Sequence, residues 1–353
     1  MMRAPTSFAV VVRRGDGSLL VRERGVPDAR SSWAKLPLVR GVSSLVESLK
    51  LGSEALRFSV EQMTEDMEAA ERSPSRQAGA GTSILSALGL TLFALATSDT
   101  SDAAAPTRAS AKKGPFGFML VVAIVFLVAL PQMAAAGTTR LFHMHLAVQS
   151  PTVQLITGAF KLTIVIGYLL LIRRVPEIRR VFQYHGAEHK TISTYEAGEA
   201  LTVANARAKT TLHPRCGTTF LVMVALVSVI AFTALGWLFR GLTSGNALVD
   251  NVGFFLLKLP FLPVLIAVTF EVQRVFARYC TTGPLRALLW PGFLVQKITT
   301  IEPSDDQLEV ALASLRATLF RETSPQDGCV DGGDVAFPSY DAMAGAERLR
   351  IAA

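Results

Sequence analysis

Four long apolar segments constrain the fold of this chain more than any other feature of its sequence. A helix needs about 20 apolar residues to cross the hydrocarbon core of a bilayer. Segments of about this length lie at residues 115–136, 155–173, 217–239 and 251–272. Only 18% of the 353 residues are charged, whereas roughly 25% is usual in a soluble domain. We therefore expect a mostly α-helical membrane protein with about four transmembrane helices.

A shorter apolar run at residues 80–97 is diluted by glycine, serine and threonine. It is either a re-entrant or interfacial helix, or a fifth span. We favour the first alternative, because a fifth span would place the arginine-rich segment 1–79 on the opposite side of the membrane. In the last long segment, Pro260 and Pro263 predict a kink near its beginning.

The segment 1–79 has the pattern of a small α+β domain. The β-prone runs at 8–12 and 19–21 flank a glycine-containing turn, and this arrangement predicts a hairpin. Between Leu38 and Leu56, apolar residues recur at helical spacing. They predict an amphipathic helix that either packs on the hairpin or lies on the membrane surface.

The chain after the last span divides into two parts. We expect residues 273–320 to form a cytoplasmic helical segment, in which Asp305 and Asp306 supply the acidic first turn of a helix that ends near Phe320. Residues 321–353 are rich in glycine, aspartate and serine, and we expect them to be disordered.

The positions of the basic residues predict the orientation in the membrane. Lys and Arg are concentrated in cytoplasmic loops, and the segment between the second and third long runs carries eight of them, namely Arg173, Arg174, Arg179, Arg180, Lys190, Arg207, Lys209 and Arg215. The loops 137–154 and 240–250 contain only Arg140 and Arg240. We therefore place residues 174–216 in the cytoplasm. The net charge of +7 reflects this topology, and no nucleic-acid partner is expected.

The cytoplasmic segment 174–216 contains the motif His185-Gly-Ala-Glu188-His189. Residues four apart share one helical face, so the two imidazoles are placed to hold one divalent metal ion, with zinc as the expected ion. The order His-x-x-Glu-His matches the inverted zinc-peptidase pattern. In that pattern the histidines bind the metal and the glutamate, here Glu188, acts as general base.

A catalytic zinc site needs a third protein ligand and leaves a fourth position for water. The candidates are His213, Cys216, Glu196 and Glu199. His213 and Cys216 lie three residues apart where the third long run begins, so either could complete the set. The alternative is a purely structural network, in which these side chains satisfy one another by hydrogen bonds.

Two blocks of sequence resemble a known family. The string from Val175 to Thr191, which contains the histidine motif, and the string from His213 to Thr218 resemble the signatures of the YqhQ-type bacterial membrane proteins. Weaker similarities extend over about residues 1–320. Members of this family are usually described as predicted metal-dependent enzymes, so the resemblance implies a metal-dependent enzyme of the bacterial inner (cytoplasmic) membrane.

Two function classes follow from these observations. The first is a membrane-embedded metal-dependent hydrolase, which acts at the cytoplasmic membrane surface on a lipid-linked or membrane-peptide group. Arg179, Arg180 and Arg215 are then available to contact anionic lipid or phosphate. The second class is a non-enzymatic scaffold, assembly or transport-accessory protein, whose signature block docks a protein partner.

Overall fold

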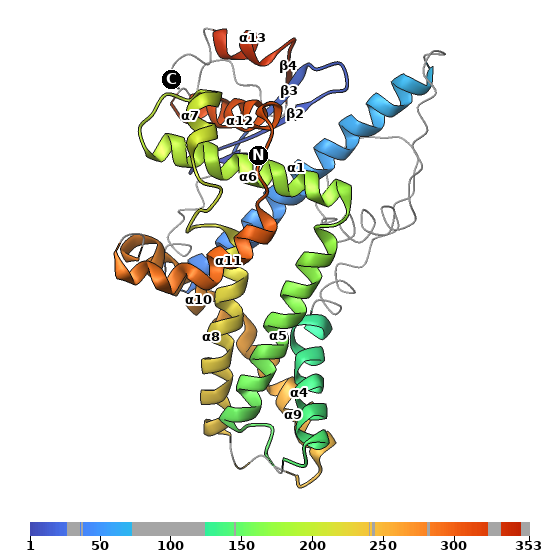
Figure 1. The fold of residues 1–353 in the computed structure, drawn as a ribbon, viewed down its shortest axis with the longest axis vertical. Helices are drawn as coiled ribbons and strands as arrows, with labels where there is room; N and C mark the ends of the chain where they lie inside the picture. The colour runs from blue at the N-terminus through green and yellow to red at the C-terminus, as the bar shows by residue number, and fades with distance from the viewer. Residues whose placement is uncertain are drawn as a thin grey trace.

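The computed structural model describes residues 1–26, 36, 38–72, 124–144, 146–239, 241, 244–280, 283–323 and 333–346. A bundle of long apolar helices forms one end of the molecule, and a headpiece of helices around a small sheet forms the other (Figure 1). The predicted run at 80–97 and the beginning of the run at 115–136 lie outside the described residues.

The sheet of the headpiece has four antiparallel strands in the order β1-β2-β3-β4. They are β1 (Met2–Arg3), β2 (Ser7–Arg13), β3 (Leu19–Gly25) and β4 (Asp334–Phe337). Strands β2 and β3 pair in the register Val11↔Val21 and confirm the predicted hairpin. Their turn contains Gly17 at a φ of +89°, a conformation that side chains with a Cβ rarely adopt.

Helices cover both faces of this sheet. On one face, Phe8, Val10 and Leu20 pack against α1 (Val39–Arg72). On the other face, Ala9 and Val11 pack against α12 (Asp305–Thr323). Successive side chains of a strand point to opposite faces, so the apolar run of β2 serves both layers. The predicted amphipathic helix is therefore α1, which is longer than expected and packs on the hairpin.

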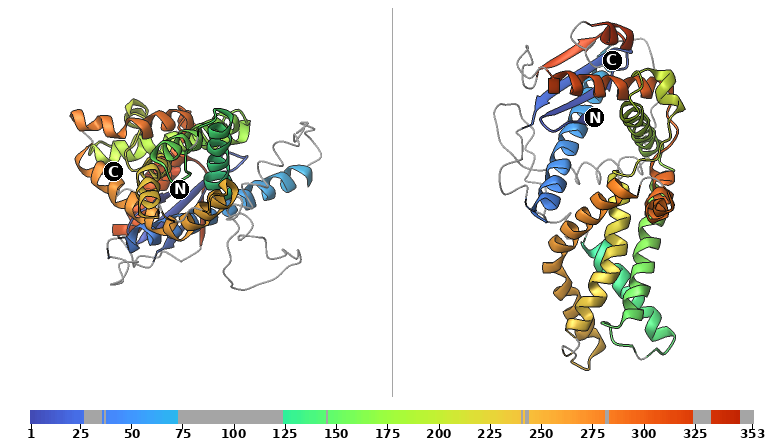
Figure 2. Two further views of the ribbon diagram at one scale, coloured as in Figure 1. Left: turned by 90° about the horizontal axis from the view of Figure 1, so that it is seen from below. Right: turned by 90° about the vertical axis from the view of Figure 1, so that its left-hand side faces the viewer.

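Helix α12 is the central helix of the headpiece. It begins at the predicted Asp305, but apolar residues are buried on two of its sides. Its second buried face, with Leu308 and Leu312, packs against α6 (Pro176–Glu196) and α7 (Val203–Ala208). Figure 2 shows α12 between the strands and α6. The order of layers is thus α1, sheet, α12, α6, and this stack holds α6 at the junction with the bundle.

The expectation that residues 321–353 are disordered is wrong for residues 333–346. These residues form β4 and the short helix α13 (Tyr340–Gly345). Strand β4 pairs with β3, and Arg22 binds the carboxylate of Asp334 at 2.7 Å. The Met343 side chain is fully buried in the core between the sheet and α12. The polar composition of residues 321–353 gave no indication that Met343 would be buried or that β4 would pair with the edge of β3.

Replacing Met343 with alanine is expected to destabilise the headpiece. Deletion of a fully buried methionine side chain costs about 2–5 kcal/mol, because transfer free energy is lost and a cavity remains. Thermal unfolding of the purified variant, together with the rate at which a protease cuts near residue 340, measures this effect. If Met343→Ala unfolds and is cleaved like the unaltered protein, α13 does not anchor the C-terminal segment.

Among the described residues, three helical segments of the bundle are long and apolar enough to cross a membrane. They are α5 (Pro151–Ile172), α8 (Gly217–Leu238) and the stretch Ala247–Tyr279. The last stretch is divided into α9 (Ala247–Lys258), the 3-10 turn η3 (Leu259–Phe261) and α10 (Leu262–Tyr279). Pro260 and Pro263 lie at this break, where the kink was predicted, since proline lacks the N–H needed for a continuous helix.

The first predicted span is described only from residue 124 onward. Its described part forms the π-helical turn η2 (Val125–Ala129) followed by α4 (Leu130–Leu141). This part is helical, but it is too short to be counted among the three long segments. The structure therefore shows a mostly helical protein with three helices able to span a membrane, and a fourth remains a prediction.

The headpiece and the bundle are joined by packed elements as well as by the chain. Arg40 of α1 donates a hydrogen bond to Glu271 of α10 at 2.6 Å. After α10, η4 (Pro284–Leu289) leads into α11 (Trp290–Thr299), which packs against α8. Residues 300–304 then connect α11 directly to α12. The expected C-terminal helical segment thus runs from the bundle into the core of the headpiece.

Candidate metal centre

Helix α6 presents His185 and His189 on the same face, as their spacing predicts. The centroids of the two rings lie 4.5 Å apart at an interplanar angle of 69°. Ala187 is fully buried and belongs to the cluster that packs against α12. Burial of that side fixes the rotation of α6 about its axis and turns the two imidazoles toward the beginning of α8.

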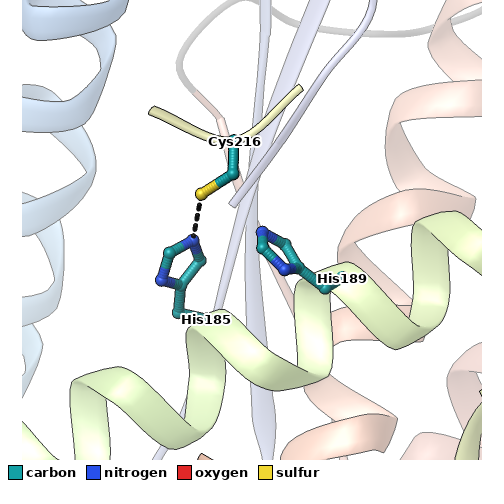
Figure 3. Close-up of side chains that lie close together, drawn as sticks. All are labelled: His185, His189 and Cys216. Atoms are coloured by element: carbon teal, nitrogen blue, oxygen red, sulfur yellow. Dashed lines mark hydrogen bonds between the residues drawn. The ribbon is translucent and has the colours of Figure 1, made fainter. Parts of the chain in front are cut away.

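Cys216 completes a compact group with the two histidines. It is the N-cap residue of α8, and its Sγ lies 3.3 Å from Nε2 of His185. One ligand atom from each of His185, His189 and Cys216 lies within 4.8 Å of the other two. Figure 3 shows both rings projecting from α6 toward the sulfur. His189 and Cys216 are buried, and His185 is half-buried.

Backbone carbonyl groups fix the orientation of both rings. Nδ1 of His185 lies 3.0 Å from the carbonyl oxygen of Thr299, and Nδ1 of His189 lies 2.5 Å from that of Thr211. A carbonyl oxygen can only accept, so each Nδ1 carries the hydrogen. In the neutral ring, Nε2 then keeps its lone pair. The arrangement therefore directs a free ring nitrogen of each histidine, together with a sulfur atom, toward one point.

Glutamine side chains hold the loop that carries Cys216. Gln296 of α11 accepts a hydrogen bond from the backbone N–H of His213 at 2.9 Å and donates to the His213 carbonyl at 2.6 Å. Gln273 of α10 donates to the carbonyl of Cys216 at 3.2 Å. The sulfur position is thus set by two helices that are remote in sequence from α6.

His213, the other predicted third ligand, lies beside the group. Its Nε2 pairs with Glu196 at 3.2 Å, and Glu196 also accepts from Arg215 at 2.8 Å. The His213 ring centroid is 5.7 Å from that of His189. Of the remaining candidates, Glu199 pairs with Lys209. Among the described residues, the structure therefore brings Cys216 to the two histidines and leaves His213 and Glu196 next to them.

Glu188, the predicted general base, lies on α6 between the two histidines. Its Oε1 accepts a hydrogen bond from the amino group of Met1 at 2.6 Å, and its side chain is 27% exposed. It is outside the group of three whose ligand atoms converge. Its negative charge nevertheless acts on His185 and favours the protonated ring.

The electrostatics of the group favour a thiolate. Burial raises the pKa of Cys216, but hydrogen bonds and positive charge from His185 and His189 outweigh burial and bring that pKa to about 5. Burial lowers the pKa of His185, yet the contacts with Cys216 outweigh it and leave the pKa raised. Both directions favour a thiolate beside a protonated His185 ring, whose Nε2 regains its lone pair when that proton leaves. For His213, burial dominates and the pKa is lowered.

Sequence reasoning missed the supporting groups. Thr299 and Thr211 orient the two histidines through their backbone carbonyls, so the identity of their side chains does not indicate this role in the sequence. Gln296 lies within residues 1–320, over which the family resemblance extends, but nothing in the sequence places it against His213. The sequence indicates no role for Gly186, although it lies within the histidine motif. A Cβ built on Gly186 would lie 2.2 Å from the carbonyl oxygen of Ile301, so this position requires glycine.

Comparison with known proteins agrees with the resemblance. The family model described as protein of unknown function (DUF1385) matches residues 36–321. The chain belongs to the DUF1385 family. It is also 28% identical, over 325 residues, to the uncharacterized protein YqhQ of Bacillus subtilis (strain 168), and the match covers 88% of this chain and 86% of that protein. No solved structure matches the chain. The DUF1385 match includes the whole candidate centre.

Proposed function

We propose that this protein is a membrane-embedded metal-dependent hydrolase that holds one divalent ion, zinc, at His185, His189 and Cys216. One observation carries the proposal. Both imidazoles give their Nδ1 hydrogens to backbone carbonyls, and one ligand atom of each lies within 4.8 Å of the Cys216 sulfur. Metal-binding histidines commonly have this second contact, which fixes the tautomer and the ring orientation.

The geometry suits a tetrahedral ion after a small adjustment. Zinc binds nitrogen at about 2.0–2.1 Å and thiolate sulfur at about 2.3 Å, so ligand atoms around it are roughly 3.3–3.8 Å apart. The three ligand atoms here lie within 4.8 Å of one another. Side-chain rotations that move these atoms by about 1 Å would bring them to the distances that zinc requires. Imidazole and thiolate ligands favour zinc over magnesium or calcium.

Three protein ligands leave one position for water or substrate, which is the arrangement of catalytic zinc sites. When bound, such an ion supplies a Lewis acid and lowers the pKa of a water molecule. The chain itself supplies Glu188 as general base, one turn from His185. Glu196 contacts His213 and forms an ion pair with Arg215. Arg215 is exposed and is available to an anionic group of the substrate.

The location of the centre suggests the kind of substrate. Cys216 immediately precedes α8, and α6 follows the end of α5, so the centre lies where two candidate membrane helices meet the headpiece. The basic residues between 173 and 215 support a cytoplasmic location in the bacterial inner membrane. A lipid-linked or membrane-peptide substrate at the cytoplasmic surface fits this position, as does contact with anionic lipid.

Metal analysis of the purified protein tests the ligand set. After extraction without chelator, we expect about one zinc ion per chain in the unaltered protein and close to none in Cys216→Ser or His189→Ala. Cys280→Ser is the matched control, because Cys280 is also a buried free cysteine but lies outside the group. A metal-free unaltered protein, or loss of zinc in Cys280→Ser, would falsify the proposed centre.

The enzymatic part of the proposal has a separate test. Zinc-loaded protein is assayed with fluorogenic ester, peptide and phosphodiester probes, alongside Glu188→Gln. We expect Glu188→Gln to keep its zinc and to lose about 100-fold or more in hydrolysis rate, which is the range of general-base contributions. A zinc-loaded protein without any such activity would leave a metal-binding scaffold.

A further inference from the structure

Two lysines are buried inside the helical bundle, away from the candidate metal centre. Lys161 lies midway along α5 and is 9% exposed, and Lys258 is the last residue of α9 and is 1% exposed. An ionisable side chain at this depth of a membrane is costly and marks a functional site in most cases. The pair is independent of the proposed hydrolase function.

Neither lysine has an anionic partner among the described residues. Nζ of Lys161 donates to the hydroxyl of Ser228 at 2.8 Å, and Nζ of Lys258 donates to the amide oxygen of Gln132 at 2.8 Å. Both acceptors are neutral. An ammonium group has three hydrogens to donate, so each lysine retains donors that a ligand could use.

The two ammonium groups converge on one aromatic ring. The Nζ atoms of Lys161 and Lys258 lie 5.6 Å and 4.9 Å from the centroid of Phe232, and Lys258 is also 4.6 Å from that of Phe254. Cation–π contacts of this kind offset only part of the cost of burying a charge. Two cations around one ring repel each other, and a shared anion would relieve that repulsion.

The carboxylates of the described bundle helices are engaged elsewhere. Helices α4, α5 and α8 contain no acidic residue in their described ranges. Within the stretch that includes α9 and α10, Asp250 accepts hydrogen bonds from Ser244, and Glu271 pairs with Arg40. The described bundle helices therefore offer Lys161 and Lys258 no carboxylate partner.

A cavity lies at the end of the bundle opposite the metal centre. It has a volume of about 440 Å³, and its wall includes Arg140, Thr139 and Asn251. Gln132 connects this wall to the lysines, because its amide nitrogen donates to the carbonyl of Asn251 at 2.6 Å while its amide oxygen accepts from Lys258. Lys258 also lies at the break before η3, and broken membrane helices commonly contribute to ion sites.

We propose that Lys161 and Lys258 bind a small monovalent anion in the interior of the bundle, and that the anion enters through the cavity that contains Arg140. The ligand class follows from two cations with spare donors, neutral polar neighbours and a basic entrance. Chloride, a small monovalent anion, is the probe for this class of ligand.

Chloride binding to the whole protein in neutral detergent tests this site. Chloride replaces gluconate at constant ionic strength, and ³⁵Cl line broadening and the unfolding temperature are recorded. The unaltered protein is expected to broaden the chloride signal saturably and to gain thermal stability. Lys161→Met and Lys258→Met are expected to bind chloride at least about tenfold more weakly, because each removes one of two buried charges.

Two further variants keep this test decisive. Lys50→Met removes an exposed lysine of α1 and is expected to bind chloride like the unaltered protein. Lys258→Arg retains the charge, so it is expected to keep chloride binding even where Lys258→Met unfolds. Absence of saturable broadening in the unaltered protein, or equal weakening in Lys50→Met and the buried-lysine variants, would overturn the proposal.

Discussion

Removal of the metal ion with a chelator is expected to lower the unfolding temperature of the protein by about 5 °C. The proposed ion would join His185 and His189 of α6 to Cys216 at the beginning of α8, so it would bind the folded chain and not the unfolded one. Free ligand at a thousand times its dissociation constant contributes about 4 kcal/mol. With an unfolding entropy of about 2.1 cal/mol/K per residue, each kcal/mol corresponds to about 1–2 °C in a chain of 353 residues.

Scanning calorimetry with and without chelator measures this effect, and two variants define its origin. His189→Ala lacks one ligand, so its unfolding temperature should be the same in both conditions. Cys280→Ser should respond to chelator as the unaltered protein does. An unaltered protein that ignores the chelator, while metal analysis confirms that the ion is gone, would show that the ion does not link the two helices.

The length of the apolar runs was sufficient to predict the long helices of the bundle. The runs around α5 and α8 are apolar on all sides, so no tertiary information is needed to recognise them. The break at Pro260 and Pro263 follows from the missing backbone hydrogens of proline. The β2–β3 hairpin is likewise local, since the turn and the two apolar runs adjoin in sequence.

The arrangement of the headpiece could not be predicted in this way. One buried face of α12 contains Leu308 and Leu312, but the opposite face packs on Ala9 and Val11, about 300 positions earlier in the chain. Burial on two sides depends on that pairing, which no local pattern specifies. The same applies to β4, whose ordering requires the free edge of β3.

The candidate site was predictable only where it is local. The spacing of His185 and His189 on one helix gave their common face. It could not decide between His213 and Cys216, because that choice depends on how Gln296 and Gln273 hold the loop before α8. The carbonyl groups of Thr211 and Thr299, which set the tautomers, are common to every residue type and leave no trace in a sequence.

Replacement of Gly186 with alanine is expected to damage both the stability of the headpiece and the metal centre. The added Cβ would lie 2.2 Å from the carbonyl oxygen of Ile301, an overlap with backbone that rotation of a side chain cannot relieve. Ile301 also donates its N–H to the carbonyl of Phe182 in α6 at 3.0 Å, so the segment 299–301 is held against the helix. We expect a cost at the upper end of the about 1–3 kcal/mol typical of overpacking.

The same displacement reaches the proposed ligands. Thr299, two residues before Ile301, accepts the hydrogen bond from Nδ1 of His185, and loss of such a contact typically weakens metal binding about 10–100-fold. Thermal unfolding and a zinc titration of Gly186→Ala measure the two effects. Gly52→Ala in α1 is the matched control, since its Cβ would meet only Cε of Met1 at 3.9 Å. There, the higher helix propensity of alanine should stabilise by up to about 1 kcal/mol. A Gly186→Ala protein that unfolds and binds zinc like Gly52→Ala would mean that the segment 299–301 does not press on α6.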